Sequence, residues 1–75
     1  SIQPNPFSTA AELHFSNAGH QVFDLVITDI NGNVVRTLNT TGNTITINRD
    51  ELPAGMYLYR LTGISESQSG KFVIN

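Results

Sequence analysis

The sequence predicts an all-β fold, an antiparallel β-sandwich of six to seven short strands. Apolar and polar residues alternate in several short runs, turn-forming residues recur at intervals of about 8–12 positions, and no window has the spacing of an amphipathic helix. The chain has 75 residues, the size of one small domain, and it contains no cysteine that would form a disulfide bond. A hydrophobic core of this size is expected to be only marginally stable.

The N-terminal residues 1–8 are predicted to form a semi-rigid linker, and the sandwich domain follows over residues 9–75. Pro4 and Pro6 each bias the preceding residue toward extended or polyproline geometry. Phe7 is an isolated large apolar residue after this stretch, and we expect it to anchor the linker on the edge of the core.

The first half of the sandwich is predicted to contain three strands. Residues 9–15 and 22–30 alternate between apolar and polar side chains, which indicates strands with one buried face. Asn31 and Gly32 then separate this second run from residues 34–38. Because Asn-Gly between two β-rich runs is a strong hairpin signal, residues 34–38 are expected to pair antiparallel with residues 22–30.

A second group of strands surrounds the most aromatic run of the chain. Residues 44–48 predict a strand near a sheet edge, and the turn at Pro53 and Gly55 starts another over residues 56–61. Both faces of residues 56–61 are largely apolar, so this strand is expected to be central and covered on both sides. Tyr57 matches the tyrosine corner of immunoglobulin-like sandwiches, whose hydroxyl returns to upstream backbone. The predicted sandwich is therefore immunoglobulin-like.

The C-terminal residues predict one more loop and one more strand. Residues 63–70 are polar and rich in serine, which is typical of a hairpin loop or a mobile tip. Lys71 is followed by the apolar residues Phe72, Val73 and Ile74, and residues 71–75 are expected to be the final strand.

Composition excludes several classes of partner. Four Lys and Arg residues against six Asp and Glu residues give a net charge of −2, so nothing indicates a nucleic-acid partner. No run approaches the roughly 20 apolar residues of a membrane span, and the first residues lack the features of a signal peptide. The chain starts with Ser1, which fits a module cut from a longer polypeptide as well as it fits a processed chain.

No constellation of residues predicts catalysis, a metal site or a cofactor. Glu12 and His14 share one strand face and His20 lies in a turn, but an exposed strand face explains them better than a metal site. The loop serines lack a nucleophile elbow. Asp29 is expected to accept backbone N–H groups across the adjacent turn rather than to act chemically.

Four blocks of residues, in order along the chain, resemble the motifs of one known family. The blocks are Pro4, Asn5, Pro6 and Phe7; Phe23, Leu25, Ile27, Asp29, Gly32 and Val35; Leu52, Gly55 and Tyr57; and Gly70, Lys71, Phe72, Val73 and Ile74. Together they resemble the C-terminal sorting domain (type A) of type IX secretion cargo from Bacteroidetes. The resemblance covers essentially every residue. Two positions depart from the family pattern: Gln3, where an aromatic residue is frequent, and Met56, where Val or Ile is commoner.

The resemblance implies a secretion address and no enzymatic activity or cofactor. The expected partners are the upstream cargo domain, the outer-membrane type IX translocon and a sortase-like surface protease that removes or exchanges the domain. The expected route runs through the periplasm to the cell surface or the medium. Lys71, Phe72, Val73 and Ile74 are the predicted recognition residues, since an edge strand can add to a partner's sheet. An open edge is also compatible with a weak dimer.

An accessory β-sandwich module of a secreted hydrolase or adhesin is the alternative reading. Such a module would bind carbohydrate or act as a spacer, and Tyr57 and Tyr59 would supply the sugar-stacking platform. Retention on insoluble polysaccharide that is lost on substitution of either tyrosine would favour this alternative.

Overall fold

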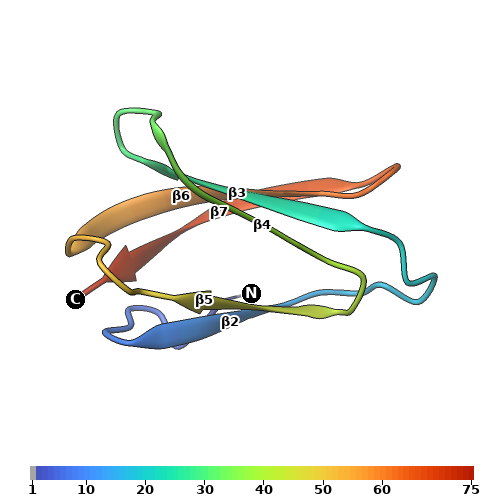
Figure 1. Cartoon of the computed structure of the whole chain (residues 1–75), viewed down its shortest axis with the longest axis horizontal. Coiled ribbons are helices and arrows are strands. Elements are labelled where there is room, and N and C mark those ends of the chain that lie inside the picture. Colours follow the sequence, from blue (N-terminus) through green and yellow to red (C-terminus); the bar gives the residue numbers. More distant parts are fainter. Residues whose placement is uncertain (1) are drawn as a thin grey trace.

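The computed structural model describes residues 2–75, which form seven β-strands in two facing sheets (Figure 1). The strands are β1 (Ile2–Gln3), β2 (Ala10–His14), β3 (Phe23–Asp29), β4 (Val34–Thr40), β5 (Thr44–Asn48), β6 (Gly55–Thr62) and β7 (Ser67–Ile74). One sheet has the order β1-β2-β5 and the other β4-β3-β6-β7, and neighbouring strands are antiparallel. The predicted antiparallel sandwich is confirmed, and β5 is an edge strand as expected. Residues 2–75 contain no helix long and apolar enough to cross a membrane.

The core lies between the two sheets and is built by alternate residues of their strands. Its buried side chains are Ile2, Phe7, Ala11, Leu13, Phe23, Leu25, Ile27, Ile45, Ile47, Tyr57, Leu61, Phe72 and Ile74. Among residues 2–75 no charged side chain is buried, so apolar packing is the main source of stability. The core includes Ile2 and Phe7, which means that part of the predicted linker packs into the sandwich. Phe7 is the anchor that the sequence predicts.

The predicted hairpin is present between β3 and β4. Leu25 lies opposite Leu38, and the register shifts by one residue between Ile27 and Thr28. β4 continues to Thr40, two residues beyond the predicted strand. The two extra residues, Asn39 and Thr40, are polar, so the apolar pattern does not mark them. They belong to the strand because they still pair with Asp24 and Phe23 of β3.

The expectation that β6 is covered on both faces is wrong. β6 lies between β3 and β7, so it is central within its sheet, and its inner face carries Tyr57 and Leu61. On the outer face, however, Met56 is 44% exposed and Leu58 is 42% exposed. The described residues form two layers only, so no third layer covers this face.

The expectation of a polar loop over residues 63–70 is also wrong in its second half. A short turn closes where the Gly63 amide donates to the Glu66 carbonyl at 2.8 Å, and β7 then begins at Ser67. Residues 67–70 are polar and mostly exposed, yet they pair in regular register with β6. Backbone pairing holds this half of β7, and alternation of apolar side chains cannot reveal it.

Candidate functional site

The last strand, β7, lies at one edge of the four-stranded sheet and pairs with β6 along its whole length. Phe72 and Ile74 point into the core and are 0% and 1% exposed. Lys71 is exposed and Val73 is half-buried. Of the four predicted recognition residues, two therefore fix the strand in the sandwich and two are accessible from outside.

Phe72 is the centre of an aromatic cluster. The ring of Tyr57 stacks on it at a centroid distance of 5.6 Å, and the ring of Phe7 lies at 5.6 Å with a tilt. Tyr59 adds a third ring at 6.4 Å. The cluster joins β6, β7 and the linker segment (residues 1–8), so loss of Phe72 would disturb the whole domain.

The linker segment pairs with the C-terminal end of β7 on the side away from β6. The Phe7 amide donates to the Val73 carbonyl at 3.1 Å, and the Asn75 amide donates to the Phe7 carbonyl at 2.8 Å. Asn5 Oδ1 accepts the Val73 amide at 3.0 Å, in the manner of a backbone carbonyl. Phe7 and Ile74 consequently form a parallel bridge, and this end of the β7 edge is occupied.

The Arg49 side chain ties Ser8 and Asn75 to the corner between β5 and β6. Its Nε donates to the Leu52 carbonyl at 3.0 Å, and its Nη1 donates to the carbonyls of Ser8 and Asn75. A planar guanidinium can hold several acceptors at once in fixed geometry. Arg49 therefore connects the linker segment, the last residue and the turn before β6.

The corner before β6 contains the third block of motif residues. The Leu52 amide donates to the Arg49 carbonyl at 3.0 Å, and Gly55 has a φ of 149°, a region that side chains rarely adopt. The Tyr57 hydroxyl donates to the Pro53 carbonyl at 2.6 Å. The predicted tyrosine corner is thus confirmed, and Tyr57 is the residue that forms it.

Asp29 organises the turn between β3 and β4. Its Oδ1 accepts the amides of Asn31 and Asn33 at 2.9 and 3.0 Å, and its Oδ2 accepts the Asn33 side-chain amide at 3.2 Å. These donors, with Asn33 the strongest, hold the pKa of the Asp29 carboxyl below its ordinary value. Gly32 has a φ of 88°, which this tight turn requires. The structural role predicted for Asp29 is confirmed.

The residues weighed for a metal site or a sugar platform have other partners. His14 Nε2 lies 3.3 Å from Glu12 Oε1, its Nδ1 lies 3.2 Å from Thr44 Oγ1, and no three potential ligands gather anywhere in residues 2–75. Tyr57 is buried and Tyr59 is half-buried, both on the inner face of β6. The two tyrosines do not form an exposed stacking surface.

The sequence reasoning missed Arg49 and the pair formed by Tyr59 and Gly70. Tyr59 lies opposite Gly70, and a Cβ on Gly70 would come within 2.8 Å of the tyrosine ring. The pairing of β6 with β7 would have been needed to recognise this fit. Arg49 stands in a charged corner of the sequence, and nothing local distinguishes it from a solvated arginine.

A comparison with protein families matches residues 1–75 to the secretion system C-terminal sorting domain. The chain belongs to this family. It is a non-catalytic C-terminal sorting domain of type IX secretion cargo, as the motif resemblance implied. No match is found among curated protein sequences.

Membership in this family indicates which function the surface around β7 could serve. A sorting domain interacts with the type IX machinery, and its cargo is secreted by that system. The C-terminal end of β7 lies beside Asn5 and Phe7, whereas Ile2 and Gln3 pair with β2 in the other sheet.

Proposed function

We propose that this sorting domain directs an upstream cargo protein through the outer-membrane type IX translocon, which recognises Lys71, Phe72, Val73 and Ile74 in β7. The cargo and the folded domain pass through the periplasm and reach the cell surface. A sortase-like surface protease then removes the domain or exchanges it, and the cargo stays on the surface or is released.

The observation that carries this proposal is the position of β7 at a sheet edge. Lys71 offers an exposed cation and Val73 a half-buried apolar side chain, and both project from the outer face of the sheet. Upstream of the end that Asn5 and Phe7 occupy, the β7 edge also offers backbone groups to a partner. Together these features give a partner both affinity and a means of selection.

The proposed address is a folded strand rather than a linear peptide. Phe72 and Ile74 are core residues, so they act by holding Lys71 and Val73 in one orientation. Deletion of residues 71–75 would remove this part of the core and unfold the domain. Such a truncation cannot separate loss of the address from loss of the fold.

The linker segment joins the proposed address to the cargo. We propose that residues 1–8 are the entry segment from the cargo, and the contacts of Asn5 and Phe7 with β7 support a fixed spatial relation between the cargo junction and the address. The proposed cleavage by the surface protease would fall in or before this segment.

Export of a reporter protein tests the proposal. The reporter carries a Sec signal peptide, is fused ahead of Ser1, and is expressed in a Bacteroidetes host that has the translocon. Lys71→Ala is compared with Thr37→Ala, which removes an exposed side chain from β4 at the opposite edge of the same sheet. We expect Lys71→Ala to accumulate in the periplasm, whereas the parent and Thr37→Ala reach the surface or the medium.

Both variants must have the urea midpoint of the parent, because each loses an exposed side chain that supports no core contact. Equal delivery of all three fusions would overturn recognition through β7. Periplasmic retention of the parent fusion would contradict the sorting function itself.

A further inference from the structure

The edge of β7 is open over residues 67–71. Val73 directs its amide and carbonyl away from β6, toward Asn5 and Phe7. Outward groups alternate along an antiparallel strand, so Ser67, Ser69 and Lys71 also direct theirs away from β6. Within residues 2–75 no segment pairs with this part of the edge.

The opposite edge of the same sheet is protected. Arg36 on β4 donates to the carbonyls of Asn48 and Arg49, and its Nη2 lies 3.7 Å from Asp50 Oδ2. These bonds tie β4 to the end of β5 and place a charge beside both strands. Inward-facing charges of this kind prevent edges from pairing with other chains. The β7 edge has no such device over residues 67–71.

Two cations without anionic partners lie beside the open edge. Arg36 and Arg49 are held by acceptors of the domain itself. The exposed side chains of Arg60 and Lys71 make no hydrogen bond or ion pair with any group of residues 2–75. They are diagonal neighbours on the outer face of β6 and β7, because Lys71 lies opposite Leu58 and Arg60 is two residues further along β6.

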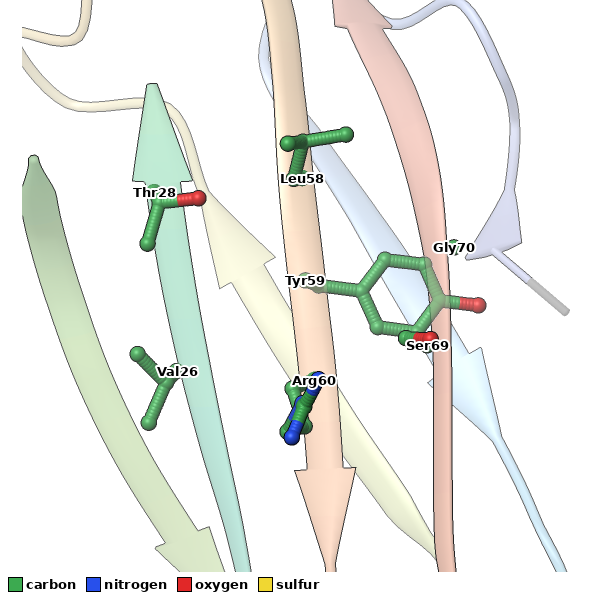
Figure 2. Close-up of a pocket in the computed structure, with 7 residues that line it drawn as sticks. All are labelled: Val26, Thr28, Leu58, Tyr59, Arg60, Ser69 and Gly70. Carbon is green, nitrogen blue, oxygen red and sulfur yellow. The ribbon is translucent and has the colours of Figure 1, made fainter. Parts of the chain in front are cut away.

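A hollow lies beside Arg60 on the outer face of β3, β6 and β7. Its volume is about 450 Å³, and Figure 2 shows residues that line it, among them Val26, Thr28, Leu58, Arg60 and Ser69. In Figure 2 the Arg60 side chain lies over β6, and Ser69, directly opposite it on β7, has only a small side chain. Side chains of a strand added beside β7 that point to the outer face would lie on the same face as Arg60 and Lys71.

Tyr59 adds a hydrogen-bonding group at the same edge. In Figure 2 its ring extends from β6 across β7, at Gly70, and the hydroxyl lies on the far side of the β7 ribbon. The hydroxyl has no hydrogen-bond partner among residues 2–75. A strand placed beside residues 67–71 would find this hydroxyl next to its own backbone.

We infer that residues 67–71 bind an extended acidic segment of a partner protein as an additional β-strand. The outward amides and carbonyls of Ser67, Ser69 and Lys71 supply the backbone pairing, and a carboxylate of the segment lies between Arg60 and Lys71. This inference rests on the proposed recognition through β7, and it names the chemistry of the partner that β7 receives.

A second copy of the chain is a poorer occupant of this edge. Antiparallel pairing of two β7 strands about Ser69 would place the two serines opposite each other. The Arg60 side chains of both copies would then extend toward each other on the same face, and like charges repel. An acidic segment satisfies the same two cations without this repulsion.

Peptide titration of the 15N-labelled chain tests the inference. The probe is a capped heptapeptide, Thr-Val-Thr-Glu-Thr-Val-Thr, and its control has Lys in place of Glu. We expect the Glu peptide to slow hydrogen exchange at the Ser69 and Lys71 amides and to bind about fivefold more tightly than the Lys peptide. Equal affinities, no binding, or protection confined to β4 would overturn the inference.

Two pairs of variants locate the site. Ser69→Pro removes an outward amide while leaving the bonds to β6, and it is expected to abolish peptide binding, whereas Ser69→Ala keeps the amide and the affinity. Lys71→Glu should remove the preference for the Glu peptide, whereas Thr37→Glu should not. A variant is tested only if its amide spectrum resembles that of the parent, which shows that it is folded. If Ser69→Pro does not fold, the comparison of Lys71→Glu with Thr37→Glu decides the test.

Measuring the oligomeric state of the chain tests whether a second copy occupies this edge instead. A concentration-dependent dimer that Lys71→Glu alters and Thr37→Glu does not would assign the edge to a second copy and overturn the inference. These measurements involve no translocon, so a negative result here leaves the reporter export assay, and the sorting function that it tests, unaffected.

Discussion

At the scale of single residues, Tyr57 has two separable contributions to stability. Its ring is buried against Phe72, and its hydroxyl donates to the Pro53 carbonyl. We expect Tyr57→Ala to cost about 3–5 kcal/mol through loss of the ring. Tyr57→Phe should cost about 0.5–1.5 kcal/mol, because only one hydrogen bond is lost. Urea unfolding measures both, and a parental midpoint for Tyr57→Ala would contradict a buried ring.

Asp29 makes the stability of the domain sensitive to acid. Its folded-state pKa lies below the ordinary value of 3.8, so its stabilising contribution is complete above pH 3.8 and is lost as the pH falls through the folded pKa. The Asp29→Asn variant lacks this titration. We expect the parent to lose more stability than the variant when urea midpoints are followed from neutral pH to well below 3.8. Parallel profiles would show that the Asp29 carboxylate contributes nothing to the turn.

At the scale of elements, the fit of Tyr59 over Gly70 sets how β6 and β7 pack. Gly70→Ala would place a Cβ 2.8 Å from the tyrosine ring, and the resulting strain is expected to cost about 1–3 kcal/mol. In a Tyr59→Ala background, Gly70→Ala should lower the free energy of unfolding by much less, because the ring that it would meet is absent. Thermal unfolding of the four proteins in this double-mutant cycle gives the coupling. Additive effects would mean that the ring can move aside freely.

The strands differ in how well their sequences predict them. β2, β3 and β5 each bury one face, so period-two alternation located them to within about two residues at each end. The first half of β7 has no apolar face and is held by its neighbour, so only tertiary pairing reveals it. The outer face of β6 is apolar yet exposed, because the number of layers is a property of the whole fold.

The candidate site was predictable in position but not in organisation. The terminal apolar run marked β7, and Phe7 and Tyr57 were recognised as core residues. The pairing of Asn5 and Phe7 with β7 joins residues 68 positions apart, and no local pattern encodes such a contact. The open edge near Ser69 likewise follows from strand order.

At the scale of the whole molecule, Arg49 holds three distant parts of the chain together. We expect Arg49→Ala to cost about 1.5–3 kcal/mol and to speed hydrogen exchange at the Val73 and Asn75 amides, because charged hydrogen bonds to the linker and to the C-terminal residue are lost. Arg60→Ala is the matched control, since that side chain bonds to no described residue. Equal exchange in both variants would show that Arg49 does not tie the ends together.

The parallel bridge between Phe7 and Ile74 also determines how the domain bears tension. Upstream of this bridge β1 pairs with β2, so a load from the cargo side acts first on that pair. A load that then acts between Phe7 and Ile74 pulls the two bridged segments along their length in opposite directions. Their hydrogen bonds lie across that direction and must break together in shear, whereas an antiparallel pair loaded from one end opens bond by bond. If a secretion machine grips β7 and the cargo resists, the Phe7–Ile74 bridge would therefore be loaded in shear.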